Sequence, residues 1–352
     1  MGIEVDDFSQ LLEKLGDPSK PLRLSRLHGL SDLHGERLDR FCAALDAYPT
    51  ERRRRLLRVL LHLAEGSFDL SFDSIFRHSL QDTDAVVRAI AVEGLWEDRD
   101  PRLIGPLLAM LRSDPSPRVR AAAAADLGRY VLAGELQELE TPLEARVLSE
   151  LLTAVYLKGE SLDVRRRALE SAAYSGSPEV AEALRQAYFH DDERMRRSAV
   201  LGMGRSCALR WRPILLQELK SDSTAMRCEA VLACGELGLK DSVPVLGERL
   251  HDPDKQVMSA SIWALGQIGG SAARQLLLEA YAGANDDTQV AIDDALAEQT
   301  LSTGDSGFMV YEMDNVEDEE WLADGDEYLW DNPGKDDLDD AGLDDRRQER
   351  YS

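Results

Sequence analysis

A nine-residue pattern recurs along this chain at nearly constant spacing, and it constrains the fold more than any other feature. The pattern is valine or methionine, arginine, two variable residues, alanine, an apolar residue, a variable residue, a small residue and an apolar residue. Six copies begin at Val87, Val119, Val164, Met195, Met226 and Val257, and a degenerate copy lies near Val290. The successive steps are 32, 45, 31, 31, 31 and 33 residues. Such a period is the signature of stacked supersecondary units.

Four columns of the pattern predict what each copy folds into. At 100° per residue, the first, fifth, sixth and ninth positions fall on one face of a helix and form its core stripe. The fifth column is always small, which allows a neighbouring helix to approach closely. Its members are Ala91, Ala123, Ala168, Ala199, Ala230 and Ser261.

A turn rich in Asp and Ser precedes most copies of the pattern, and a shorter apolar-periodic segment precedes each of these turns. Asp and Ser side chains accept hydrogen bonds from the free amides of a helix start, and Pro117 suits a first turn. Each repeat is therefore predicted to be a helix A, a turn and a helix B. Helix B is expected to end or bend near a glycine that follows the ninth position. These glycines are Gly128, Gly204, Gly235 and Gly266.

The pattern divides the chain into three predicted regions. Residues 1–66 lack it but contain helical segments at 21–30, 33–47 and 51–65, and we interpret them as a divergent N-terminal cap. Residues 67–301 form the repeat array. Residues 302–352 carry 18 Asp or Glu against 4 Lys or Arg, so we expect an acidic, disordered tail.

With its aspartate turn and its Val-Arg-x-x-Ala core, the pattern resembles the HEAT repeat family, and in particular the short HEAT-like repeats of phycobilisome lyases. The copy from Asp114 to Gly128 matches most closely. The resemblance implies an all-α fold, a right-handed α-solenoid in which helix B lines the concave surface. It also implies a ladder of turn Asp and helix Arg between neighbouring repeats. Met258 replaces the arginine, so the ladder is expected to end there.

Charge and composition narrow the function. The net charge is −25, which disfavours general nucleic-acid binding because phosphate affinity comes from cationic contacts. The arginine clusters at 52–55, 165–167 and 194–197 are better explained as ladder or solvated residues. No apolar run approaches the ~20 residues of a membrane span, and the N-terminus lacks signal-peptide regions. We therefore expect a cytoplasmic protein with four reduced cysteines.

Enzymatic relatives of the repeat can be tested by their residues. Deoxyhypusine hydroxylases hold iron with His-Glu pairs, but none of the six histidines here is followed by Glu. The pair most similar to His-Glu is Cys228-Glu229, which occurs once. Bilin lyases offer no residue motif to compare, and the cysteines lack C-x-x-C spacing. We predict no metal and no cofactor, and an enzyme related to the lyases or hydroxylases remains the alternative.

The seventh column of helix B points most directly away from the core and changes character along the chain. It is small or acidic in the first three copies and apolar in the last three. Exposed apolar rows mark contact sites, although tight curvature could instead bury these side chains between successive B helices. The candidate partner-binding residues are Arg197, Leu201, Leu232 and Trp263 in the array and Trp321 and Trp330 in the tail.

The sequence thus favours a non-enzymatic scaffold or adaptor. It would bind a protein partner through the concave helix-B face, with the acidic aromatic tail as a second contact. The 45-residue step contains an insertion around 133–142, which is either a recognition loop or an adjustment of the superhelix. The sequence does not give the partner's identity or the oligomeric state.

Overall fold

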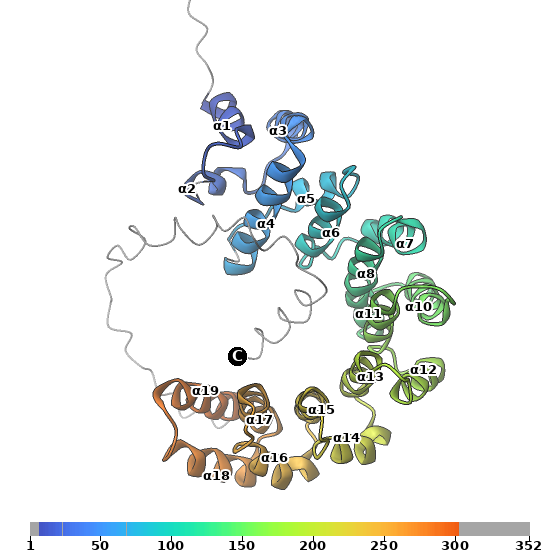
Figure 1. The fold of residues 1–352 in the computed structure, drawn as a ribbon, viewed down its shortest axis with the longest axis vertical. Coiled ribbons are helices and arrows are strands. Elements are labelled where there is room, and N and C mark those ends of the chain that lie inside the picture. Colours follow the sequence, from blue (N-terminus) through green and yellow to red (C-terminus); the bar gives the residue numbers. More distant parts are fainter. Residues whose placement is uncertain (1–6, 23, 68, 303–352) are drawn as a thin grey trace, which may run out of the picture. The chain divides into compact units, whose positions relative to one another are not determined.

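The computed structural model describes residues 7–22, 24–67 and 69–302, and every regular element in these ranges is helical (Figure 1). The chain divides into two compact units, with the boundary between Ser206 and Cys207. We call them unit 1 and unit 2. Trp321, Trp330 and the rest of the predicted tail lie outside the described residues. No helix in the described ranges combines the length and the apolar character that crossing a membrane requires.

Unit 1 contains α1 to α13, and its helices alternate between two layers. The helices that carry the pattern follow one another on the inner side of the unit, with their hairpin partners outside (Figure 1). The outer or A helices are α3 (Gly35–Ala47), α5 (Asp73–Ser79), α7 (Ile104–Ser113), α10 (Thr141–Tyr156) and α12 (Pro178–Tyr188). The inner or B helices are α4 (Thr50–Gly66), α6 (Ala85–Gly94), α8 (Pro117–Asp126), α11 (Leu162–Ala172) and α13 (Glu193–Arg205). The remaining elements are α1 (Asp7–Gly16), α2 (Leu24–Leu27), η1 (His28–Leu30), η2 (Pro101–Leu103) and α9 (Gly128–Glu135).

Unit 2 repeats the arrangement with three hairpins. Its A helices are α14 (Arg212–Glu218), α16 (Val243–Arg249) and α18 (Gly270–Tyr281). Its B helices are α15 (Thr224–Glu236), α17 (Lys255–Ile268) and α19 (Asp286–Ser302). Short 3₁₀ turns lead into the first two hairpins: η3 (Leu209–Trp211) and η4 (Lys240–Ser242). Within the unit, α15 packs against α17 and α17 against α19. The described fold is the all-α repeat solenoid that the period predicts.

The core stripe lies where the pattern predicts it. In the six full copies, every residue of the first, fifth, sixth and ninth columns is buried, at most 4% exposed, whereas Val290 of the degenerate copy is 61% exposed. The predicted turns also supply the helix caps. Asp84 accepts from the amides of Val86 and Val87, and Ser223 accepts from the amide of Met226. A stripe that wide needs neighbours on two sides, and within each unit B helices such as α8 and α17 pack on their hairpin partners and on the adjacent B helices.

The repeat begins earlier than the pattern indicates. In every B helix of the pattern, the second column is the fourth residue of the helix, and Arg53 holds that place in α4. Leu56 and Leu57 then fall in the fifth and sixth columns, and both are fully buried. The helices α3 and α4 are therefore a hairpin of the same kind, although a leucine replaces the small fifth residue. The predicted helix at 21–30 is instead the short α2 followed by η1.

The glycines after the ninth column have a packing role besides ending the helix. A Cβ built on Gly235 would lie 2.6 Å from the ring of Trp263 and 3.0 Å from the backbone of Ala264, both on α17. At Gly266 the corresponding atoms belong to Ala295 of α19, at 3.0 to 3.2 Å. Successive B helices therefore touch backbone to backbone at this column.

The insertion in the 45-residue step forms an additional helix. The short helix α9 begins at Gly128, directly after α8, and a turn at 136–140 leads into α10. α9 packs against α10 and α11. Leu132 and Leu136 on its outer side are 38% and 60% exposed. The insertion is therefore an ordered part of unit 1.

We expect Gly235→Ala to destabilise the fold by about 1–3 kcal/mol, because its methyl group would overlap α17. Urea unfolding followed by circular dichroism measures the change. Gly105→Ala is the matched control, since Gly105 lies in α7 with no atom within 4 Å of the added Cβ. The control should gain up to ~1 kcal/mol from helix propensity. Equal effects of the two substitutions would contradict the close approach.

Candidate functional site

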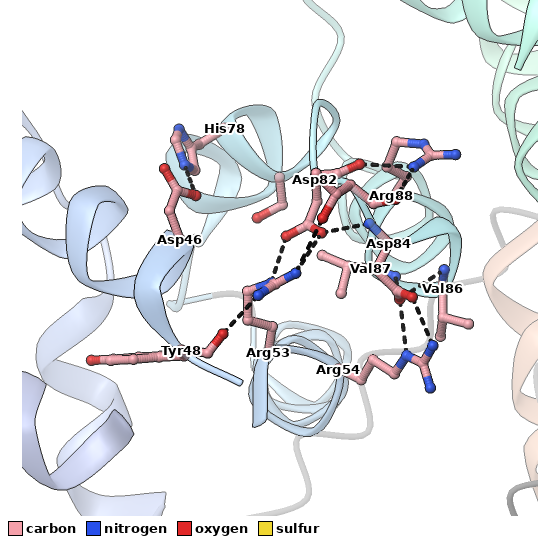
Figure 2. Close-up of polar contacts among 12 residues, drawn as sticks. Asp46, Tyr48, Arg53, Arg54, His78, Asp82, Asp84, Val86, Val87 and Arg88 are labelled. Atoms are coloured by element: carbon pink, nitrogen blue, oxygen red, sulfur yellow. Dashed lines mark hydrogen bonds and ion pairs between the residues drawn. The ribbon is translucent and has the colours of Figure 1, made fainter. Parts of the chain in front are cut away.

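A ladder of arginines and turn carboxylates joins successive repeats, and it orients the B-helix face. Arg53 of α4 donates from Nε and Nη2 to the two carboxylate oxygens of Asp82, at 2.8 and 3.0 Å (Figure 2). Its Nη1 donates to the carbonyl of Tyr48, in the turn before its own helix, at 2.7 Å. One guanidinium therefore fixes its own turn and the turn of the next repeat.

The same rung recurs along both units. Arg88 donates from Nε and Nη2 to the two carboxylate oxygens of Asp114, at 2.8 and 2.9 Å. Its Nη1 donates to the carbonyl of Asp82. The other rungs of this form are Arg120 to Glu160 in unit 1 and Arg227 to Asp252 in unit 2. The ladder that the resemblance implies is confirmed. Asp82 lies six residues before Arg88 and Asp114 six before Arg120, because each Arg donates to the backbone carbonyl of the Asp in its own turn. The carboxylate of each turn binds the preceding repeat.

Four consecutive arginines at the start of α4 point in different directions. Arg52 donates to the carbonyls of Leu15 and Lys20, and so fastens the C-terminal end of α1. Arg53 forms the rung, and Arg54 binds Asp84 through two hydrogen bonds of 2.9 and 2.7 Å (Figure 2). Asp84 also caps α6, and the hydrogen bond from Arg54 is the main reason that its pKa falls to about 2. Arg52, Arg53 and Arg54 therefore each contact a different part of the fold.

The joint between α11 and α13 is built differently. Arg165, which holds the rung position, donates to the carbonyl of Val155. The contact between the two helices is made instead by a buried polar cluster. Arg166 donates to Ser198 Oγ at 3.0 Å, Ser198 donates to Glu170 at 2.6 Å, and Arg167 donates to Glu170 at 2.9 Å. In the sequence, Arg166, Arg167 and Glu170 look like surface charges. In the structure, these three side chains are at most 7% exposed.

A second buried carboxylate lies where α8 meets α9. Asp126 pairs with Arg129, which also donates to the carbonyl of Leu95 at 2.7 Å and stacks on Tyr130. Within the described residues the second carboxylate oxygen of Asp126 accepts no hydrogen bond. Burial raises the pKa of Asp126 to about 7, against the attraction of Arg129.

The structure places the candidate partner-binding residues unevenly. Leu201 on α13 is only 6% exposed, so the apolar row is not open at that position. Leu232 on α15 and Trp263 on α17 are half-buried, and the Trp263 ring packs over Gly235. Arg197 on α13 is also half-buried. The open part of the predicted row therefore lies in unit 2.

An apolar groove of about 730 Å³ on the A-helix side of unit 1 was not predicted. It lies between α10 and the start of α12, and Leu148, Leu152, Tyr156 and Leu157 line it. Tyr156 and Leu157 are about half exposed. Leu148, Leu152 and Tyr156 follow one another every four residues, so the sequence could have indicated a second apolar face on α10.

No set of three or more His, Cys, Asp or Glu side chains in the described ranges is arranged to hold a metal ion. Cys234 lies in the core column, and burial raises the pKa of its thiol to about 12. This keeps the thiol protonated and unreactive.

Comparison with known proteins identifies the repeat. The family model described as HEAT repeats matches residues 75–154, 148–209 and 212–297. No curated protein matches the chain significantly.

Three solved structures illustrate the range of similar folds. Human deoxyhypusine hydroxylase in complex with glycerol is 21% identical over 74% of this chain and 95% of its own, with a TM-score of 0.33. The CpcE and CpcF complex of phycocyanin lyase from Nostoc sp. PCC7120 is 20% identical over 55% and 74%, with a TM-score of 0.39. Importin beta is 16% identical over 84% and 45%, with a TM-score of 0.42. Likenesses this low carry no functional argument.

Replacing Arg88 by Met, the residue found at position 258, should destabilise the fold by about 2–4 kcal/mol. The substitution leaves the carboxylate of Asp114, which is 8% exposed, without its bidentate partner. Denaturant unfolding measures the loss. Arg185→Met is the control, since its pair with Glu182 is about half exposed, and an ion pair this accessible to water and salt contributes little to stability. Similar losses in both variants would refute the rung's structural role.

Asp126 should make stability depend on pH. Its folded pKa of about 7 exceeds the unfolded value of about 3.9, so its contribution is full below pH 4 and is lost as pH rises through 7. We expect the unfolding free energy of the wild type to fall relative to Asp126→Asn by on the order of 2 kcal/mol between pH 5 and 8. Parallel pH profiles for the two proteins would contradict this assignment.

Proposed function

Because this chain belongs to the HEAT-repeat family, we propose that it is a non-enzymatic scaffold that binds a protein partner along its B-helix layer. The acidic, aromatic segment beyond residue 302 is proposed as a second contact, with Trp321 and Trp330 as its anchors. In this proposal the partner, rather than a small substrate, is the ligand of the array. The rungs hold successive B helices in fixed register, as an extended binding surface requires.

The observation that carries the proposal is the half-buried apolar pair on the B helices of unit 2. Leu232 and Trp263 occupy the seventh column, opposite the core stripe, on adjacent helices α15 and α17. Neither side chain is fully buried, although both are large and apolar. Tryptophan is a frequent anchor of protein–protein interfaces. Arg197 on α13, in unit 1, is proposed as a separate polar contact.

An enzyme of the superfamily, related to bilin lyases or to deoxyhypusine hydroxylase, is the alternative. The sequence lacks the His-Glu pairs that the hydroxylase resemblance would require. Metal analysis of the purified protein separates the two functions. Stoichiometric iron or zinc would favour the enzyme over the scaffold.

Affinity capture with the full chain, read by mass spectrometry, tests the scaffold. We expect Leu232→Asp and Trp263→Ala each to lose at least tenfold of the captured partner, because they remove apolar contacts at the centre of the surface. Deleting residues 303–352 should weaken capture further.

The matched control is Leu278→Ala on the outer helix α18, where the side chain is 45% exposed. This variant should capture the partner at the wild-type level. Thermal melting checks that all variants are folded. Capture that is unaffected by Leu232→Asp and Trp263→Ala would remove the proposed surface, and no enriched partner at all would end the scaffold proposal.

A further inference from the structure

The last described B helix of unit 2, α19, has one exposed side. It packs against α17 and against its hairpin partner α18 (Figure 1). The exposed positions are 286–287, 290, 293–294 and 297–298, and this spacing places them on one side of the helix. Val290, in the middle of that side, is 61% exposed. We call this set of positions the α19 face.

The preceding B helices show what the corresponding side of a B helix receives in unit 2. On α15, Gly235 meets Ala264 of α17, and on α17, Gly266 meets Ala295 of α19. Gly266 lies two residues after Ala264, so Ala297 holds on α19 the place that Gly266 holds on α17. Ala297 is exposed. The α19 face therefore has a small residue at the point of helix contact, and no described helix packs on it.

The α19 face is acidic. The helix contains no Lys or Arg, and all of its carboxylates lie on this face: Asp286, Asp287, Asp293, Asp294 and Glu298. At 100° per residue, they flank the line through Val290 and Ala297 on both sides. None of the carboxylates forms an ion pair with a described residue. Asp293 accepts a hydrogen bond of 3.5 Å from the hydroxyl of Tyr281.

The cations of unit 2 do not neutralise this face. Residues 207–302 contain 8 Lys or Arg, and six of them lie on A helices or in the turns beside these helices: Arg210, Arg212, Lys220, Lys240, Arg249 and Arg274. Of the two on B helices, Arg227 binds Asp252 in its rung. Lys255, the exposed first residue of α17, pairs with no described carboxylate. In the described B helices of unit 2, Lys255 is thus the one cation that is not bound to a carboxylate.

Helix stability does not account for this arrangement. Asp286 and Asp287 in the first turn suit the helix dipole, but Glu298 lies near the C-terminal end, where a negative charge is unfavourable. Asp294 and Glu298 are four residues apart on the helix, so they repel each other. A polar capping helix would also be acidic, but it does not require a valine in the middle of its outer face.

We propose that the α19 face binds a basic amphipathic helix of a partner protein, which packs where a further B helix would. Apolar residues of that helix contact Val290 and Ala297, and its Lys or Arg side chains bind the flanking carboxylates. This inference rests on the proposed scaffold function, and adds a second surface of the array together with the chemistry of its ligand.

Charge favours this occupant over three others. Residues 302–352 of the chain itself carry 18 Asp or Glu against 4 Lys or Arg, and a second copy of the chain carries a net charge of −25. Nucleic acid carries a phosphate at every nucleotide. Each of the three would bring further negative charge to the α19 carboxylates and be repelled, whereas a basic helix is attracted.

Fluorescence anisotropy with the full chain tests the proposal. The probe is a fluorescein-labelled peptide of about 20 residues made of Leu, Ala and Lys, with the leucines on one helical face and lysines on either side. We expect binding at about 50 mM salt and a loss of affinity as salt increases. Asp294→Lys with Glu298→Lys should weaken binding at least tenfold, because repulsion replaces attraction. Ala297→Gln should weaken it at least threefold, because a longer uncharged side chain stands where the helices touch.

The matched control for charge is Glu248→Lys with Glu279→Lys, which changes the net charge equally at exposed positions of the A helices α16 and α18. It also measures any attraction of the peptide to the acidic segment beyond residue 302. Ala272→Gln, at an exposed position of α18, is the control for Ala297→Gln. Both controls should change the affinity by less than threefold. Melting curves check folding, and Ala297→Gln remains a test if the α19 charge variant does not fold.

A second peptide of the same composition in scrambled order keeps the charge and loses the apolar face. It should bind at least tenfold more weakly than the helical peptide. Three outcomes would overturn the proposal: no binding of the helical peptide, equal binding of the two peptides, or equal losses in the α19 variants and their controls.

Failure here differs from failure of the scaffold function. Leu232→Asp and Trp263→Ala should change the peptide affinity by less than threefold. If these variants abolish peptide binding and the α19 variants do not, the basic helix binds the apolar pair, and the α19 proposal fails while the scaffold function stands. Capture of a partner through Leu232 and Trp263 does not depend on the α19 carboxylates.

Discussion

The guanidinium at the fourth residue of helix B connects three pieces of the chain at once. It lies on one helix, holds the carbonyl of the turn before that helix, and binds the carboxylate of the next turn through two parallel hydrogen bonds. At Arg88 and Asp114 both side chains are about nine-tenths buried, so the pair is shielded from salt and water. Burial alone would raise the pKa of Asp114, but the hydrogen bond from Arg88 holds it below its ordinary value. Asp114 therefore stays ionised and paired with Arg88 when the stacking of the repeats buries it.

At the joints that have a rung, the rung fixes one end of the B helix, and the small residues allow the helices to meet at the other. The alanine column brings the helices together along the core, and glycine permits backbone contact near the C-terminal end. Two separated attachments define the angle between neighbouring repeats better than one. Within a unit, side chains of the seventh column on consecutive helices therefore have a defined spacing, as the proposed recognition of a partner across several repeats would require.

Much of this arrangement was predictable because it repeats. Period and helical geometry correctly predicted the buried columns and the turns, and the resemblance to HEAT-like repeats implied the ladder. The sequence failed where a residue acted outside its column. The repeat that contains Arg53 was not recognised, because Leu56 replaces the small residue that defines the pattern. Arg166 and Glu170 looked like surface charges, since nothing in one sequence shows that they satisfy each other.

The candidate surface was less predictable for a related reason. Leu201 and Leu232 are equivalent by column, yet one is buried and the other is not. The difference depends on what packs around each helix, which column position alone does not contain. The additional helix α9 was likewise visible as a length difference, but its packing against α11 was not.

The two kinds of joint differ in how freely the array can grow. At an ordinary rung every repeat offers the same donor and the same acceptor, so a duplicated repeat could be inserted between α6 and α8 and still find its contacts on both sides. The joint between α11 and α13 has no such interchangeable surface, because Arg166 and Glu170 of α11 meet Ser198 of α13 there in place of a rung. Gain or loss of repeats by recombination should therefore be tolerated on the N-terminal side of this joint and excluded at the joint itself.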